Sequence, residues 1–427
     1  MPSKIYDVIV VGTGAGGGMA IKTLCEAGLS VLALNPGRRT VPSRDYRNHK
    51  QPYDMKYRGF GDPRADRYHE ESEYAHDCWE HDIAYTNAPG TDWEWVRVKV
   101  TGGKCNFWGR SSARFGDIDF QAASLDGVDV DWPVTYKEIA PYYSRIEKWI
   151  GVASTVQNRP SNPDGEYIPP FPFRCLDCIL QKAADKIGVP YLPDRIAQLT
   201  VAHNGHAPCH YCGGCSTGCD TGSFFSPTWF TIPAGEATGK LELRTNAIAK
   251  NVLVDENGHA KGVAYIDRET REEVVVFAKA VVMAASCVET AHIMLNSKSR
   301  IWPTGIANSS GQLGRNLCDH LYGTPAMVTC LNSWDNPAGR TTFPTRPFPG
   351  CRAGKTLRTR ARRSSFAATR STPMEGVAAS PGTSRSLRVL GVSLRRISSG
   401  TIPLRSALRS RLRHCRARQT TWISILR

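Results

Sequence analysis

The segment Tyr6 to Arg38 constrains the fold more than any other part of this chain. It opens with an unbroken apolar run, Val8 to Val11, which is typical of a strand buried on both faces. Glycines follow in GxGxxG spacing, then a stretch that predicts a helix from Met19 to Ala27, and then a second apolar run, Val31 to Leu34. This order, within about 30 residues, predicts a β-α-β unit near the N-terminus.

Each of the three spaced glycines has its own physical reason. Gly12 permits a tight turn, Gly14 lets the backbone approach a pyrophosphate without a Cβ, and Gly17 lets the helix pack close to the strand. The N-terminus of the helix then presents unpaired N–H groups and the positive end of its dipole to the phosphates. The segment therefore predicts dinucleotide binding rather than an ordinary glycine turn, and FAD and NAD both fit the motif.

The second predicted strand ends at Asn35, where dinucleotide-binding units usually carry an acid that bonds the ribose hydroxyls. The Asn35 carboxamide can accept from one hydroxyl and donate to the other oxygen. The alternative is that Asn35 is only a turn residue ahead of Pro36 and Gly37. Both interpretations stay open on the sequence alone.

Charge divides the 427 residues into two unequal parts. Residues 341–427 hold 18 Arg, one Lys and one Glu, whereas the first 340 residues hold 35 basic and 38 acidic residues. The body is therefore ordinary and slightly acidic, and it is long enough for two or more cores. The basic, Arg/Ser-rich tail has little apolar surface to offset the entropy of ordering, so we expect it to be disordered.

The sequence also predicts the cellular compartment of the protein. No apolar run approaches the ~18 residues that a transmembrane helix requires. The chain enters its first strand at once and leaves no room for a signal peptide, so we expect a cytoplasmic protein. Fourteen cysteines without an export signal argue against a disulfide scaffold.

Further elements follow from composition and periodicity. Residues 40–90 predict an irregular excursion, and Trp93 to Val100 alternates like a strand. Tyr136 to Ile150 predicts an amphipathic helix, bounded by Gly151, and Leu176 to Ile187 predicts a second one.

Short strands are predicted after the second of these helices. Leu241 to Leu243 and the stretch Val252 to Tyr265 alternate, and the latter is interrupted by a hairpin turn at Asn257-Gly258. Ala280 to Ala285 predicts a buried strand and Val288 to Leu295 a helix.

With these landmarks placed, the first ~335 residues resemble the glucose–methanol–choline (GMC) family of flavin oxidoreductases. The pieces that carry the resemblance occur in the family's order: GTGAGGG, GGKCNFWGRSSARFG, DWPVTYKEIAPYY, AKGVAYID, AVVMAASCVETAHIMLNS and SSGQLGRNLCDH. They are most similar to the branch of sugar and gluconate dehydrogenases and pyranose oxidases. The resemblance implies an α/β fold, with a Rossmann-like FAD-binding domain from residues 1–40 and 241–335. Residues 41–240 would form the FAD-covering region, a partial α+β substrate domain and a cysteine loop.

The resemblance also implies a cofactor site for FAD. Family members typically carry Glu where this chain has Asn35, and some pyranose oxidases attach the flavin covalently through a His in the region of Phe107. Because Phe107 cannot form that bond, we expect non-covalent FAD. The implied contacts are Gly12, Gly14 and Gly17 to the pyrophosphate, Asn35 to the ribose, Gly103, Asn106 and Trp108 along the isoalloxazine, Ala247 at the adenine, and Ala285 and Glu289 over the cofactor.

Four cysteines lie close together in C-x2-C-x2-C-x3-C spacing, namely Cys209, Cys212, Cys215 and Cys219. The spacing matches a bacterial ferredoxin run, although Asp220 stands where such runs carry Pro. Thiolates also suit a structural Zn²⁺. The candidates are an iron–sulfur cluster, a zinc ion, and cysteines that bind nothing.

The implied activity is oxidation of CH–OH groups in sugars or polyols, with hydride transfer to the flavin N5. The sequence does not distinguish oxygen from a quinone or cytochrome as the electron acceptor. The resemblance stops after Asn332, before the region that supplies the family's catalytic histidine pair, so no catalytic residue is assigned.

The ending of the chain is open to three interpretations. The first is that residues 341–427 are a segment read in a shifted frame. The second is a genuine basic tail that binds nucleic acid or an anionic membrane surface, but the tail has one Lys and few aromatics, so no specific nucleic-acid partner is expected. The third is that the chain as a whole is a catalytically inactive FAD-binding fragment.

Overall fold

The computed structural model describes residues 4–46, 86, 88–90, 98–127, 129–215 and 218–317, and the backbone of three short strands beyond them. The chain divides into two compact units. Unit 1 comprises residues 1–108, 210–318 and 413–427, and unit 2 comprises residues 109–209 and 319–412. Most of the predicted excursion at 40–90 and of the predicted strand from Trp93 to Val100 lies outside the described residues.

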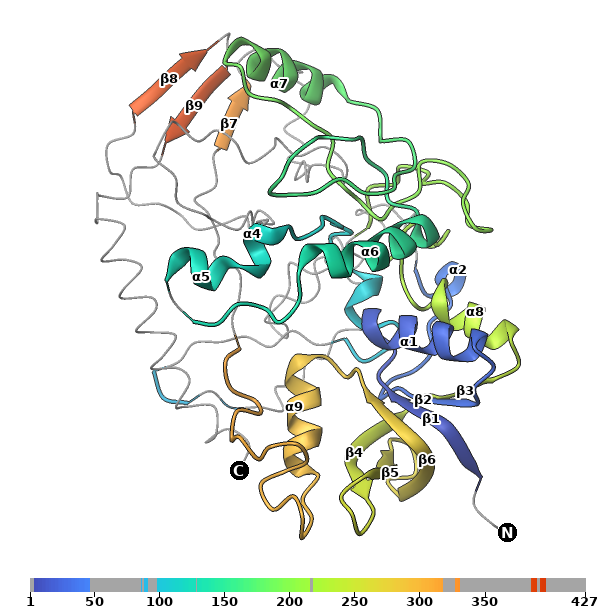
Figure 1. Cartoon of the computed structure of the whole chain (residues 1–427). Coiled ribbons are helices and arrows are strands. Elements are labelled where there is room, and N and C mark those ends of the chain that lie inside the picture. Colours follow the sequence, from blue (N-terminus) through green and yellow to red (C-terminus); the bar gives the residue numbers. More distant parts are fainter. Residues whose placement is uncertain are drawn as a thin grey trace. The chain divides into compact units, whose positions relative to one another are not determined.

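Unit 1 is built on a six-stranded sheet in the order β3-β2-β1-β6-β5-β4 (Figure 1). Its strands are β1 (Ile5–Val11), β2 (Val31–Leu34), β3 (Leu241–Arg244), β4 (Ala247–Val254), β5 (Ala260–Asp267) and β6 (Glu273–Met283). The four strands β3, β2, β1 and β6 are parallel, and β4 and β5 add an antiparallel hairpin beside β6. The carboxyl ends of the four parallel strands therefore meet at one edge of the sheet.

The helices of unit 1 are α1 (Ala15–Glu26), α2 (Pro42–Asp45), the 3₁₀ turn η3 (Gly103–Asn106), α8 (Thr231–Ala237) and α9 (Cys287–Asn296). Helices α1 and α8 lie side by side (Figure 1). A Cβ at Gly18 of α1 would come within 2.5 Å of the Thr231 hydroxyl of α8, so the contact is close. On the hairpin, the Val252 amide of β4 donates to the Ser297 hydroxyl that follows α9, at 2.8 Å.

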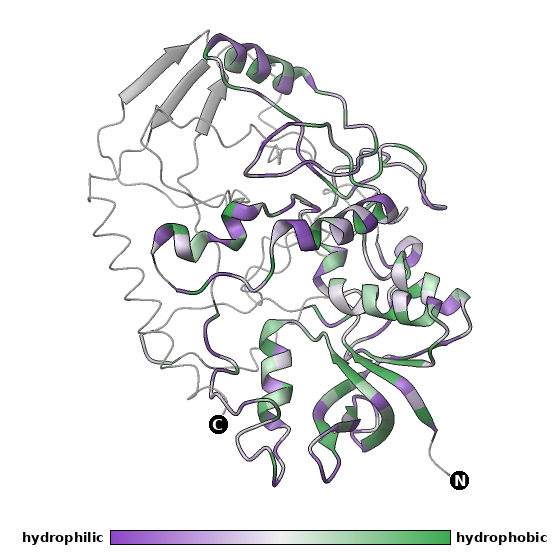
Figure 2. Cartoon of the chain, in the orientation of Figure 1, coloured by the Kyte–Doolittle hydropathy of each residue, from purple (hydrophilic) through white to green (hydrophobic). Residues whose placement is uncertain are grey.

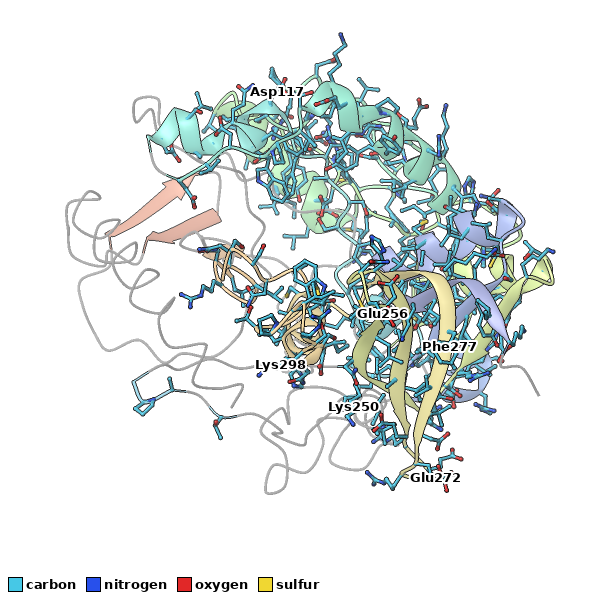
Figure 3. All side chains as sticks on the ribbon, turned by 60° about the horizontal axis from the view of Figure 1, so that its bottom comes forward. Asp117, Lys250, Glu256, Glu272, Phe277 and Lys298 are labelled. Atoms are coloured by element: carbon cyan, nitrogen blue, oxygen red, sulfur yellow. The ribbon has the colours of Figure 1, made fainter. Side chains whose placement is uncertain are left out.

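The core of unit 1 confirms the apolar runs of the sequence. Ile9 and Leu32 are fully buried, and the strands β1 and β2 are mostly green in the hydropathy colouring of Figure 2. Strand β2 has the predicted bounds, whereas β6 begins seven residues before the predicted Ala280. Residues 273–277 of β6 pair with β5, and Val274 to Phe277 are apolar as well, so the strand begins well before the predicted run. The turns at Glu256 and Glu272 lie at opposite ends of the antiparallel strands (Figure 3).

Unit 2 contains α4 (Asp117–Phe120), α5 (Ala122–Asp126), α6 (Tyr136–Ile150), α7 (Cys175–Lys186) and an antiparallel sheet β7-β9-β8 (Met327–Cys330, Val392–Arg396 and Arg385–Val389). The helix α6 has its predicted bounds because both ends are capped. Thr135 and Glu138 form a capping box at its start, and Gly151 ends it with a φ of 74°.

The predicted basic tail is described in part. Strands β8 and β9 belong to it, and the rest of residues 341–427 lies outside the described residues, so its disorder stays a prediction. In the part of the chain that the structure describes, no helix combines the length and the hydropathy needed to cross a bilayer.

Candidate functional site

The glycine loop joins β1 to α1 at the edge where the parallel strands end. A Cβ at Gly12 would lie 2.3 Å from the Ala284 carbonyl, and its φ of 98° also favours glycine. A Cβ at Gly17 would lie 2.0 Å from the Gly12 carbonyl. Both positions therefore require glycine for packing, in agreement with the roles predicted from spacing.

Gly14 differs from its two neighbours in the motif. It precedes α1, and a Cβ built on it meets nothing within 4 Å. No acidic side chain lies in the first turn of the helix. An open backbone position at the start of a twelve-residue helix is what a pyrophosphate requires, because the first N–H groups of a helix have no internal partner.

Asn35 follows β2 and is 3% exposed. Its Nδ2 donates to the carbonyls of Gly37, at 3.0 Å, and Lys99, at 2.8 Å, and its Oδ1 accepts from the Thr13 hydroxyl at 2.7 Å. Both donors of the carboxamide are thus used within the protein, which leaves acceptor capacity on Oδ1 alone. The predicted contact with a ribose stays a prediction.

The segment around η3 is held by a buried polar network. Asn106 is fully buried and donates to the Thr101 carbonyl at 2.8 Å. Its Oδ1 accepts from the hydroxyls of Ser226, at 2.6 Å, and Thr228, at 3.0 Å. The side chain predicted to lie along the isoalloxazine therefore points into the protein, so any group beside this segment would meet its backbone instead.

Trp108 and Gly103 lie in the same segment as Asn106. The Trp108 indole donates to the Phe225 carbonyl at 2.8 Å, and the two rings meet edge to face at 6.2 Å between centroids. Gly103 opens η3 with a φ of 54°, in the left-handed region that favours glycine. Their predicted contacts to a flavin ring are proposals that rest on this placement.

Cys105 stands inside the same segment, and sequence reasoning assigned it no role. Burial raises the pKa of its thiol to about 11, and a hydrogen bond with the Ala15 backbone lowers that pKa in part. The thiol therefore stays protonated near neutral pH, next to the first residue of α1. The pattern GGKCN is the sequence signal for Cys105, because a side chain inside a predicted cofactor loop faces either the protein interior or the ligand.

The remaining predicted cofactor contacts lie on other strand ends of unit 1. Ala247, which opens β4, is 2% exposed and donates its amide to the Asn35 carbonyl at 2.9 Å. Ala285 follows β6 and donates its amide to the Thr290 hydroxyl at 3.2 Å. Glu289 lies in the first turn of α9, 3.4 Å from the His292 ring. The fold thus brings Ala285 and Gly12 together, since a Cβ at Gly12 would meet Ala285 at 3.0 Å.

The cysteine cluster gives no support to the predicted iron–sulfur site. Cys215 and Cys219 are buried, whereas Cys212 is exposed. The Cys219 sulfur accepts from the Ser223 amide at 3.3 Å, and the Cys209 sulfur accepts from Gln198 at 2.9 Å. Among the described residues, which omit positions 216 and 217, no three His, Cys, Asp or Glu side chains are placed to hold a metal ion.

Comparison with known proteins gives a match to one family model and several relatives. Residues 130–322 match the family model of the GMC oxidoreductases. The chain is 29% identical to 2-methyl-1,2-propanediol dehydrogenase of Mycolicibacterium austroafricanum over 75% of this chain and 56% of that protein. It is 28% identical both to paromamine 6'-oxidase of Streptomyces fradiae, over 79% of this chain and 59% of that one, and to the fructose dehydrogenase large subunit of Gluconobacter japonicus, over 74% and 58%.

The chain thus spans somewhat more than half the length of these curated relatives. Among solved structures, pyridoxine 4-oxidase from Mesorbium loti matches with a TM-score of 0.44 and 16% identity, over 68% of this chain and 52% of that one.

Proposed function

We propose that this chain, which carries a GMC oxidoreductase domain over residues 130–322, binds FAD at the glycine loop of unit 1 and belongs to an oxidoreductase of CH–OH groups. GMC oxidoreductases bind FAD. The observation that carries the proposal is the contrast within the motif: Gly12 and Gly17 are blocked by protein atoms, whereas Gly14 faces open space. Such a cradle suits a diphosphate that approaches the backbone.

The residues present fit the cofactor in three places. The N–H groups at the start of α1 would hold the diphosphate, next to Gly14. The backbone from Gly103 to Trp108 would lie along the isoalloxazine, and Ala247 would meet the adenine through its backbone. When bound, the flavin supplies the acceptor for a hydride from carbon. Ala285 and Glu289, at the start of α9, would close over it, and Phe107 leaves the cofactor dissociable.

The substrate class follows from the relatives rather than from the site. The names of three of them refer to a propanediol, to paromamine and to fructose, each of which carries at least two hydroxyl groups. We therefore propose a sugar or polyol as the substrate.

The test of FAD binding uses a matched pair of alanine variants. Gly14→Ala places a methyl in the open position above the loop, and Gly16→Ala places the same methyl in the exposed first turn of α1, where nothing lies within 4 Å. We expect both variants to fold as the wild type does. Gly14→Ala should weaken FAD binding at least about tenfold, the equivalent of about 1.4 kcal/mol, in a titration followed by flavin fluorescence.

Two outcomes would contradict the proposal. The first is wild-type protein that stays colourless after incubation with FAD, and the second is a Gly14→Ala variant with unchanged affinity. Anaerobic addition of sugars and polyols to the FAD-loaded chain tests the proposed substrate class, because oxidation of a substrate bleaches the flavin absorbance.

A further inference from the structure

Asn35 connects three segments of unit 1 that are far apart in sequence. Its Oδ1 accepts from Thr13 in the glycine loop, and its Nδ2 donates to Gly37 beyond β2 and to Lys99 ahead of η3. The Asn35 backbone adds two contacts, since its amide donates to the Arg244 carbonyl at the end of β3 and its carbonyl accepts from Ala247. One side chain thus ties the glycine loop to the segment that leads into η3.

Thr13 extends this link to the start of η3. Its hydroxyl donates to Asn35 and accepts from the Gly102 amide at 3.1 Å, and Thr13 as a whole is 1% exposed. Gly102 has a φ of 79°, and a Cβ there would lie 2.3 Å from the Thr228 hydroxyl. The hydroxyl of Thr13 therefore fixes a backbone turn that has no room to shift.

The packing around Gly37 shows why the position of Lys99 matters. A Cβ on Gly37 would lie 2.6 Å from the Lys99 carbonyl, so the two backbones are already at their closest approach. The Thr101 amide donates to the Arg38 carbonyl at 3.1 Å beside this contact. A side chain that bonds both carbonyls, of Gly37 and Lys99, needs two donors, which a carboxamide has and a carboxylate lacks.

We propose that Asn35 is a positioning residue: its carboxamide, through Thr13, holds the glycine loop and the residues 99–103 in the arrangement that FAD requires. We call this hydrogen-bonded arrangement of Asn35, Thr13, Gly37 and Lys99 the clamp. The proposal rests on the proposed FAD site. It explains the departure from the acid expected at this place, because a carboxylate here would face two carbonyl oxygens with no proton to donate. The ribose contact predicted from the sequence is then secondary to the clamp.

Asn35→Asp separates the two roles by the sign of a pH effect. In the clamp, the ionised carboxylate of this variant would lose both donated hydrogen bonds, and burial beside two carbonyls would raise its pKa. Lowering the pH would protonate the carboxylate and restore one donor, so FAD affinity should rise as the pH falls from 8 to 5.5. As a ribose ligand, the same carboxylate would bind best when ionised, and affinity should stay level or fall over that range.

The surroundings of Asn35 allow the pH effect to be assigned to the new carboxyl group. The side-chain partners of Asn35 are a hydroxyl and two carbonyls, none of which titrates. Among the described residues, the charged side chains on the segments packed around it are two lysines, and three arginines with the carboxylates that pair with them. They are Lys99, Lys104, Arg38 with Asp45, Arg39 with Glu236, and Arg244 with Glu242. The wild type, measured at both pH values, controls for any effect of pH on these groups.

The experiment measures FAD affinity and the thermal midpoint of the FAD-free chain at pH 5.5 and 8 for the wild type, Asn35→Asp, Thr13→Val and the double variant. Asn257→Asp, on the exposed β4–β5 turn, is the control for the added charge. We expect Asn35→Asp to bind FAD about 10- to 100-fold more weakly at pH 8, from the loss of two hydrogen bonds, and to recover in part at pH 5.5. Thr13→Val should weaken binding, and the double variant should add little to Asn35→Asp.

Each result decides between the two proposals. Equal or tighter FAD binding by Asn35→Asp at pH 8, or an affinity that stays level or falls on acidification, overturns the clamp and leaves the FAD site intact. If even the wild type binds no FAD, the FAD site fails, and the midpoints of the FAD-free chain still test the clamp. An Asn35→Asp midpoint at pH 8 equal to that of Asn257→Asp would then refute it.

Discussion

The two units of this chain are stabilised in different ways. In unit 1, apolar strands pack into a sheet whose core side chains, such as Ile9 and Leu32, are fully buried. In unit 2, two arginines are buried among loops and helices: Arg114 is 5% exposed and Arg195 is 1% exposed. Arg195 donates to Asn162 and to the Pro163 carbonyl, both at 2.5 Å, and to Asp164 at 2.9 Å.

The two kinds of core place different requirements on the side chains of each unit. A sheet core tolerates changes of side chain that keep volume and pattern. A buried arginine requires particular partners at particular places, since an unpaired buried charge is costly. Arg114 meets this requirement with Glu147, at 2.8 and 2.5 Å, with the Tyr136 hydroxyl at 2.9 Å and with Ser144 at 2.9 Å. Breaking a buried ion pair in unit 2 should therefore cost more than a volume-conserving apolar substitution in the sheet of unit 1.

The largest effect is expected at the Arg114–Glu147 pair. Arg114→Met should lower the free energy of unfolding by about 3–5 kcal/mol, because it leaves the Glu147 carboxylate buried without its partner. Urea unfolding followed by circular dichroism measures it. Replacing both residues by Met should recover most of the loss.

The control for this pair is an exposed one on the same helix. Lys148 and Glu166 approach to 3.3 Å, with side chains 65% and 46% exposed, so Lys148→Met should change stability by less than about 1 kcal/mol. If Arg114→Met proves as mild as Lys148→Met, the contrast between the two units does not hold.

A smaller effect is expected from Gly12→Ala in unit 1, because the new methyl meets the Ala284 carbonyl and a φ of 98° disfavours alanine. We expect a loss of about 2–4 kcal/mol in the same urea assay. Gly16→Ala, in the exposed first turn of α1, places its methyl in open space and should gain up to about 1 kcal/mol. Equal effects of the two methyls would contradict the packing described for the glycine loop.

The smallest effect is expected at Glu242, an ion-pair member on the edge strand β3. Burial opposes its ionisation, but hydrogen bonds from Tyr6, Lys4 and Arg244 outweigh burial and lower its pKa from 4.5 to about 2. A lowered pKa means that the ionised form stabilises the fold above pH 4.5 and that this contribution is lost as the pH falls toward 2.

Glu242→Gln should therefore cost less than about 1 kcal/mol at pH 7, since the side chain is 37% exposed, and nothing near pH 2. Thermal midpoints of both chains between pH 2 and 7 check this. A difference between the two midpoints that grows as the pH falls would contradict the predicted direction of the pH dependence. A loss of stability as large as that of Arg114→Met would contradict the distinction between an exposed and a buried charge.

The amino-acid sequence was enough to predict the main strands of the unit 1 sheet and the helices with a repeating apolar pattern. Val31 to Leu34 and Tyr136 to Ile150 have their predicted bounds, because burial and end-capping depend on neighbours that are close in sequence. The spacing of Gly12 and Gly17 also predicted their packing, since the turn that they form is local. Interactions between residues close in sequence can be predicted from a single strand or loop.

The hydrogen-bond partners of the polar side chains, in contrast, depend on the complete fold. Asn35 finds its acceptor at Lys99, and Asn106 finds its donor at Ser226, 120 positions along the chain, so no local pattern could indicate either pairing. Arg114 and Glu147 likewise meet only after folding. Hydrogen bonds require atoms at fixed distances and angles, and these are set by the whole fold. Apolar burial requires only that apolar side chains lie on one face of a helix or strand.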